Sequence, residues 1–191
     1  MLCAPELAYQ IALGNKTQTR RPRKPGDKLI AIDGIKRVVS ASGKLKHAVG
    51  SIRTVQYAYG KPCRWWHPEE RHLLTFDGYL LHINHWENNA LGIDYEDVLS
   101  REGFERLLIE ITDIHAEDVR DISAEDAIAE ACDGNSRYGF LKKWSSFYDA
   151  TVLSQHDPLD TSTLFKVLKS RPAKKYDGFA YTFRIHSETR S

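Results

Sequence analysis

The sequence has little cysteine, and its apolar residues never form a long run. Three cysteines among 191 residues, Cys3, Cys63 and Cys132, are an odd number at wide spacing. This argues against a disulfide framework and favours a reducing, cytoplasmic setting. No run of about 18 apolar residues occurs, so we expect no membrane span. The first residues lack a basic region followed by an apolar core, so we expect no secretory signal.

Familiar cofactor and nucleophile motifs are also missing. There is no Walker-type phosphate loop and no Gly-x-Ser-x-Gly elbow. One cysteine lies near several histidines, but the spacing matches no zinc signature because a second paired cysteine is absent. These residues are Cys63, His67, His72, His82 and His85. We therefore expect neither a metal ion nor another cofactor.

The charge of the chain is balanced overall but unevenly distributed. The formal net charge is +1, yet residues 1–66 hold 13 Lys or Arg and 3 Asp or Glu, and the remainder holds 14 and 23. If the two parts fold together, they form a basic face or cleft against an acidic body, which attracts an anionic ligand. The alternative is that these charges are mixed in space and simply solvated.

The hydrophobic content of 41% is ordinary for a globular protein, and the length suits one domain.

One short run, Gly14 to Arg21, gathers amines, hydroxyls and guanidiniums behind an expected helix end. Because a strand alternates its faces, Lys16, Gln18 and Arg20 should point one way, and Thr17, Thr19 and Arg21 the other. Such a mixture can hold phosphate or carbonyl oxygens. Arg20, Arg21, Arg23 and Lys24 also form a basic cluster whose guanidiniums suit phosphate oxygens, although charge runs are more often plain solvated surface.

The periodicity predicts an α+β fold in which strands dominate and the helices are short and peripheral. We expect helices over Pro5–Leu13, after the N-cap Ser123, and over Tyr138–Phe147. The helix after Ser123 should bury Ala127, Ile128 and Ala131. Strands are expected at 17–21, 29–32, 49–59, 107–114 and 179–185, with an Asp-Gly hairpin joining 73–76 to 79–83. Strands do not alternate with long crossover helices, which favours a small mixed or antiparallel β-barrel.

Three pieces of the chain, in this order, resemble the ASCH domain of the PUA-like superfamily, in the form carried by phages and prophages. They begin at Gly14 (GNKTQTRRP), at Lys24 (KPGDKL) and at Asp118 (DVRDISAEDAIAE). The closing YDGFAYTF resembles the family's last strand. The resemblance implies one PUA-like domain over residues 1–191, with insertions at about 33–106 and 151–175 that could cover a cleft or bind a partner.

The resemblance also implies a cleft that accommodates RNA, a nucleotide or a modified base. A small bacterial N4-acetylcytidine amidohydrolase of the family uses a lysine, a threonine and a glutamate, which fall by position on Lys16, Thr19 and Glu130. In that chemistry Thr19 would be the nucleophile, Glu130 a general acid or base, and Lys16 an activating or oxyanion-stabilising charge. The alternative is that Lys16 and Glu130 form a structural ion pair. Other members are described as ribonucleases.

A basic and aromatic mixture surrounds Trp65 and Trp66, which are flanked by Lys61, Arg64 and His67. It suits stacking of nucleobases, although tryptophans are also ordinary core residues.

The leading prediction is recognition of RNA, possibly DNA, or of a modified nucleotide in a basic cleft lined by Lys16, Thr19, Arg20 and Glu130, with Thr17, Arg21, Arg23, Lys24, Trp65 and Trp66 as further contacts. An amidohydrolase acting on N4-acylated cytidine is the second possibility. An interaction protein of phage origin, without a nucleotide ligand, is the third. The sequence leaves the oligomeric state open.

Overall fold

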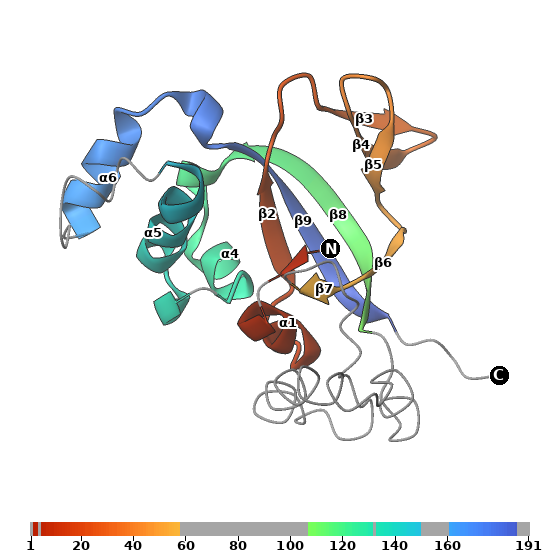
Figure 1. Ribbon diagram of the computed structural model, residues 1–191, viewed down its shortest axis with the longest axis horizontal. Helices are drawn as coiled ribbons and strands as arrows, with labels where there is room; N and C mark the ends of the chain where they lie inside the picture. Colours follow the sequence, from red (N-terminus) through yellow and green to blue (C-terminus); the bar gives the residue numbers. More distant parts are fainter. Residues whose placement is uncertain (1, 4, 58–106, 132, 150–160, 187–191) are drawn as a thin grey trace, which may run out of the picture. The chain divides into compact units, whose positions relative to one another are not determined.

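The computed structural model describes residues 2–3, 5–57, 107–131, 133–149 and 161–186 (Figure 1). The chain divides into two compact units, each of which is described by itself. The first comprises Met1–Lys16, Ile52–Glu110 and Arg184–Ser191; the second comprises Thr17–Ser51 and Ile111–Phe183. The single domain expected from the sequence stays a prediction, as do the insertion bounds.

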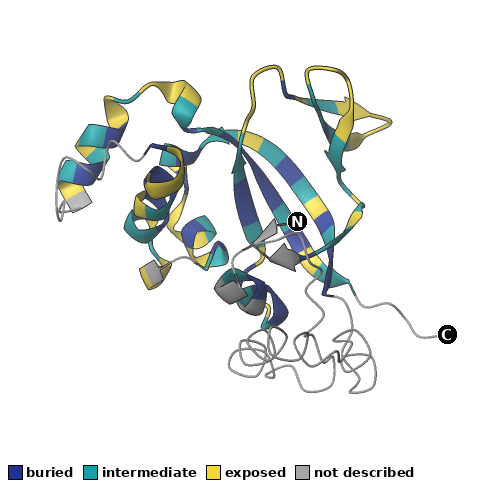
Figure 2. Cartoon of the chain, viewed as in Figure 1, coloured by how far each residue is buried: buried dark blue, intermediate teal, exposed yellow. Residues whose placement is uncertain are grey.

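The second unit is built on β2 (Gln18–Pro22), β9 (Asp177–His186) and most of β8 (Leu108–Asp118). The sheet order is β2-β9-β8-β6, and β2 pairs antiparallel with β9. β9 forms the predicted closing strand, and much of it is buried (Figure 2). Phe179, Tyr181 and Phe183 are buried, but so is Ala180 between them, so both faces of this part of the strand are covered.

The two faces of the β2–β9 pair differ in the size of the β9 side chains. Cross-strand pairing places Tyr181 beside Thr19 and Phe179 beside Arg21 on one face, and Ala180 beside Arg20 on the other. Small residues on this second face allow close packing. A Cβ atom added to Gly178 would lie 3.0 Å from Val119 Cγ1.

A second antiparallel sheet in the same unit contains β3 (Lys28–Ile32), β4 (Ile35–Val39) and β5 (Leu45–Ala48). Asp33 and Gly34 join β3 to β4 with φ angles of 52° and 74°, the left-handed pair that a tight hairpin requires. The face that carries the buried Val38 also carries His47, whose ring centroid lies 4.9 Å from that of Tyr181. This face therefore packs inward.

The helices of the second unit are α4 (Ala124–Ala129), α5 (Arg137–Tyr148) and α6 (Thr161–Lys169). Three 3-10 turns, η1 (Val119–Asp121), η2 (Asp133–Asn135) and η4 (Ala173–Lys175), adjoin them. Ser123 caps α4 as predicted, because its hydroxyl accepts from Asp126 N, and Ser136 caps α5 in the same way. Together with the end of β8 the helices enclose a core cluster of Val119, Ile122, Ala127, Phe140, Leu141, Trp144, Leu164, Leu168 and Tyr176.

The first unit contains α1 (Pro5–Ala12), which confirms the first expected helix. Its inner side buries Ala8, Ile11 and Ala12. Gly14, at φ 78°, ends it and donates its N–H to the Ile11 carbonyl. β1 (Leu2–Cys3) pairs parallel with β7 (Gln56–Tyr57), and β6 (Ile52–Thr54) pairs antiparallel with residues 108–110 of β8.

Three expectations are wrong. Among the described strands no barrel closes, because β2 ends one sheet while β3 and β5 end another. Ile128 is 53% exposed, since α4 turns Ala127 inward and Ile128 outward. Ala131 is only half-buried, because the helix ends at its C-cap Glu130. The strand expected at 49–59 is divided into β6 and β7, and the hairpin expected at 73–83 lies outside the described residues. None of the described helices is long and apolar enough to cross a membrane.

Candidate functional site

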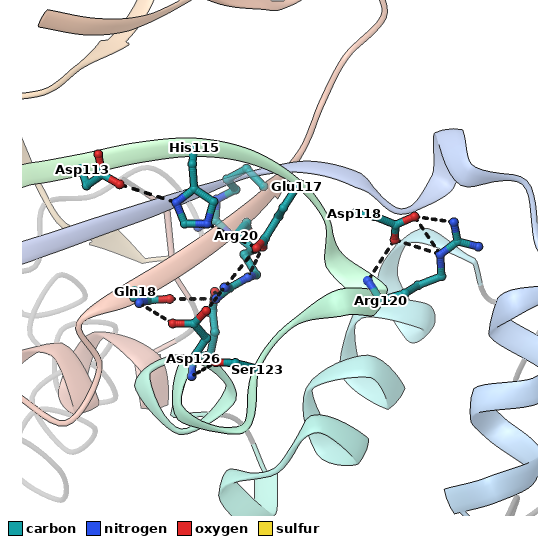
Figure 3. Close-up of polar contacts among 11 residues, drawn as sticks. Gln18, Arg20, Asp113, His115, Glu117, Asp118, Arg120, Ser123 and Asp126 are labelled. Atoms are coloured by element: carbon teal, nitrogen blue, oxygen red, sulfur yellow. Dashed lines mark hydrogen bonds and ion pairs between the residues drawn. The ribbon is translucent and has the colours of Figure 1, made fainter.

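The most extensive polar cluster of the second unit surrounds Arg20 in the middle of β2 (Figure 3). Its side chain is fully buried, and Nε donates to Glu117. Nη2 donates to Asp126 Oδ2 and Nη1 to Glu130 Oε1, each at 3.2 Å. Nη1 also donates to Gln18 Oε1 at 3.0 Å. The guanidinium thus lies within a ring of three carboxylates and one amide.

Local structure explains how these groups meet. Arg20 and Gln18 are two apart in β2 and therefore share a face; both contact Asp126, with Gln18 Nε2 donating at 2.8 Å. Asp126 and Glu130 are four apart, one in α4 and one at its C-cap, so they lie on the same side of the helix. The guanidinium carbon also lies 5.7 Å from the centre of the Phe140 ring in α5.

The electrostatics of the cluster keep Arg20 charged. Burial of the guanidinium opposes its charge, but the hydrogen bond and the charge of Glu117, followed by those of Glu130, outweigh burial and raise the pKa of Arg20. Three carboxylates, those of Glu117, Asp126 and Glu130, contact this one guanidinium. Two more polar contacts lie along β8 beside the cluster. His115 Nε2 lies 3.3 Å from Glu117 Oε2, and Asp113 Oδ1 accepts a hydrogen bond from Lys36 Nζ at 2.6 Å.

This arrangement is suited to fixing β2 against β8 and α4. A phosphate could reach Arg20 only by displacing a carboxylate from a buried site, which opposes phosphate binding. In the described part of the chain, no group of three or more His, Cys, Asp or Glu side chains is arranged to hold a metal ion.

Of the three expected catalytic residues, Glu130 belongs to the Arg20 cluster. Thr19 is buried on the face of β2 opposite Arg20, beside Tyr181. Lys16 is buried in the first unit, where its backbone N–H bonds to the Gln10 carbonyl. Glu130, also buried, pairs with Arg20. The catalytic roles of Lys16, Thr19 and Glu130 stay predictions.

The other expected ligand contacts are more open. Thr17 is exposed, although its backbone bonds to Ala129 and Phe183. Arg21 is half-buried, and Arg23 is exposed, with Nε bonded to the Asp27 carbonyl at 2.9 Å. Lys24 is exposed. Their ligand roles stay predictions.

Some expected residues cannot be placed. Trp65 and Trp66 lie outside the described residues, and so do Cys63 and the four histidines that follow it.

Sequence reasoning missed several polar residues that the fold gathers. Glu117 lies beyond the strand expected at 107–114, because β8 continues to Asp118, and no sequence signal pointed to it. Asp126 contacts Arg20 across 106 residues, and sequence spacing could not foresee that contact. Lys28 and Arg37 were not singled out. The hairpin register that places them on one face was the missing information.

Comparisons with known proteins give loose likenesses. No protein-family model matches the sequence, and no curated protein matches it significantly. An ASCH domain from Lactobacillus crispatus JV V101 is 13% identical with a TM-score of 0.48, over 94% of this chain and 70% of that one. A DUF984 protein from Enterococcus faecalis V583 is 9% identical with a TM-score of 0.39, over 98% and 80%. The Lactobacillus structure is of the family that the sequence motifs resemble. At these TM-scores neither likeness supports a conclusion about function. The phage origin suggested by the sequence stays a prediction.

Proposed function

We propose that this protein binds single-stranded RNA on the outer face of the β3–β5 sheet. The proposal keeps nucleic-acid recognition as the function but moves it from Arg20 to other cations. The observation that carries it is the hairpin register, which places Lys28 opposite Val39 and Arg37 opposite Ile30 on one face. We call this surface the basic face and define it by Lys28, Ile30, Ile32, Ile35, Arg37, Val39 and Leu45.

The surrounding sequence is strongly cationic. Residues 21–51 contain eight Lys or Arg (21, 23, 24, 28, 36, 37, 44 and 46) and two Asp (27 and 33), a difference of +6. Lys36 pairs with Asp113 and Lys46 with Asp27, so these two charges are partly neutralised. Such a surplus attracts phosphates and positions a nucleic-acid backbone.

Four cations of this segment are available for a polyanion. Lys24, Lys28 and Lys44 are exposed and Arg37 is half-buried. No hydrogen bond or ion pair joins any of the four side chains to another residue that the structure describes. Lys24 and Lys44 occupy the turns before β3 and before β5, while Lys28 and Arg37 lie on the basic face itself.

Exposed apolar side chains favour unpaired bases over a duplex. Ile32 is 42% exposed, Ile35 40% and Leu45 50%, and the register places all three on the basic face. The unpaired bases of a single strand can stack on the guanidinium plane of Arg37 and cover these side chains, whereas a duplex would present mainly its sugars and phosphates. RNA is named first because RNA recognition is what the sequence resemblance implies.

Fluorescence anisotropy with a labelled 12-nucleotide RNA tests the proposal. We expect Lys28→Ala combined with Arg37→Ala to weaken binding at least tenfold, because two phosphate contacts are lost. Lys174→Ala removes an exposed lysine from η4 and serves as the matched control. Single-stranded RNA that binds no better than duplex RNA, or a double variant that binds like the control, would overturn the proposal.

The hydrolase alternative gains no comparable support. Its glutamate, Glu130, is engaged by Arg20, and its threonine lies on the other face of β2. Nucleic-acid binding is therefore the function for which the described residues offer the better surface.

A further inference from the structure

A second concave surface in the second unit has no part in the proposed RNA binding. It is a cavity of about 480 Å³ formed by η1, α5 and α6, within the size range of small-ligand sites. Phe165 of α6 forms its main apolar surface, and Leu168, which belongs to the buried core, lies beneath it. Charged side chains from all three elements complete it.

Arg137, the first residue of α5, dominates the polar part of this cavity. Its guanidinium carbon lies 5.1 Å from the centre of the Phe165 ring, so the ring supports one face of the guanidinium. Nη2 donates to the Arg120 carbonyl at 3.1 Å. A guanidinium carries five N–H donors, and this is its one hydrogen bond to a residue that the structure describes, so among these residues a fork is left for a carboxylate or phosphate.

Two of the other charges in the cavity neutralise each other. Arg120 Nε donates to both carboxylate oxygens of Asp118, at 2.8 and 3.0 Å. Arg120 Nη1 is held by the carbonyls of Leu168 and Arg171, each at 3.1 Å. This closed pair forms a neutral wall with little donor capacity to spare.

The remaining charges favour an anion. Arg137 and Lys169 supply two positive charges, and Asp121 supplies one negative charge. All three residues are exposed. The cavity thus combines a ring-supported arginine, a nearby lysine and an apolar floor, which suits a ligand with an anionic end and a flat apolar body.

We infer that this cavity binds a small molecule that joins an anionic oxygen group, carboxylate or phosphate, to a planar apolar ring. The anionic group meets the Arg137 fork and Lys169, and the ring lies against the Phe165 side chain. The site is separate from the basic face, because the two share no residue.

Isothermal titration calorimetry of the full chain tests the inference. The probes are phenyl phosphate, benzoate, inorganic phosphate and benzyl alcohol. We expect phenyl phosphate or benzoate to bind at least tenfold more tightly than inorganic phosphate or benzyl alcohol, because only the first two satisfy both parts of the site. The comparison between the first two identifies the preferred anionic group.

Variants locate the binding. Arg137→Ala should weaken phenyl phosphate or benzoate binding at least tenfold, and Arg137→Lys should recover only part of it, since an ammonium cannot form the fork. Lys142→Ala, an exposed position on the same helix, is the matched control. Arg137 is exposed, so losing its bond to the Arg120 carbonyl and its contact with Phe165 should lower the unfolding temperature by only a few degrees, and the variant should stay folded.

Three results would overturn the inference. They are absence of heat with both ring-bearing anions, inorganic phosphate binding as tightly as phenyl phosphate, and unaltered affinity in Arg137→Ala.

Discussion

Replacing Arg20 with alanine should cost the protein a large part of its stability. The Arg20 side chain is fully buried, and its removal leaves Glu130, 5% exposed, and Glu117, 17% exposed, without their guanidinium. Breaking a buried ion pair by removing one partner typically costs about 3–5 kcal/mol. We expect Arg20→Ala to lower the free energy of unfolding by about 4 kcal/mol, a large share of the roughly 5–15 kcal/mol that holds a domain folded.

Urea unfolding followed by tryptophan fluorescence measures this loss, since Trp144 is 4% exposed within the core cluster that includes Phe140. The matched control is Arg184→Ala. Arg184 pairs with Glu110 at 2.7 Å, but its side chain is 70% exposed, so the control should cost less than about 1 kcal/mol.

A double-mutant cycle makes the test specific to the cluster. Combining Arg20→Ala with Glu117→Gln should cost less than the sum of the two single changes by more than about 1 kcal/mol, because the two groups interact directly. If Arg20→Ala costs no more than Arg184→Ala, or if the cycle shows additivity, the carboxylate ring does not hold β2 in place and the reasoning fails.

Two further predictions concern the packing and charge of the second unit. The hydrogen bonds that Arg120 donates hold the pKa of Asp118 below its usual range. The ionised carboxylate of Asp118 therefore stabilises the folded protein fully above the unfolded pKa of about 3.9. This stabilisation is lost as the pH falls through the lower pKa of the folded state. Asp118→Asn should lower the free energy of unfolding by about 1 kcal/mol at pH 7 and by less at pH 2; equal losses at both pH values would contradict the ion pair. Gly178→Ala should cost about 1–3 kcal/mol in urea unfolding, because the new methyl group would lie 3.0 Å from Val119 Cγ1 and 3.1 Å from the Arg21 carbonyl. A stability equal to that of the parent would show that the β9 face packs more loosely than described.

Local patterns in the sequence predicted the elements around the Arg20 cluster. The alternation of β2 predicted that Gln18 and Arg20 share a face, and their common contact with Asp126 confirms it. The cap at Ser123 is likewise confirmed. Both features depend on neighbouring residues alone, and so they can be read from local sequence.

Long-range partners could not be predicted in the same way. Arg20 meets Glu117 across 97 residues and Glu130 across 110, and nothing in spacing or composition selects those carboxylates from the others. The same limit explains why Arg20 was expected to contact a ligand. The prediction that Ile128 is buried was wrong for a different reason. A six-residue helix is too short for the periodicity of the sequence to show which of its faces is apolar.

The dependence of RNA affinity on salt tests the central claim most directly. If Lys24, Lys28, Arg37 and Lys44 each contact a phosphate of a single strand, the logarithm of the binding constant should fall with the logarithm of salt concentration at a slope of about −2.8. The Lys28→Ala, Arg37→Ala double variant should reduce that slope to about −1.4, while Lys174→Ala leaves it unchanged. A slope near zero, or one that the double variant does not alter, would contradict binding on the basic face.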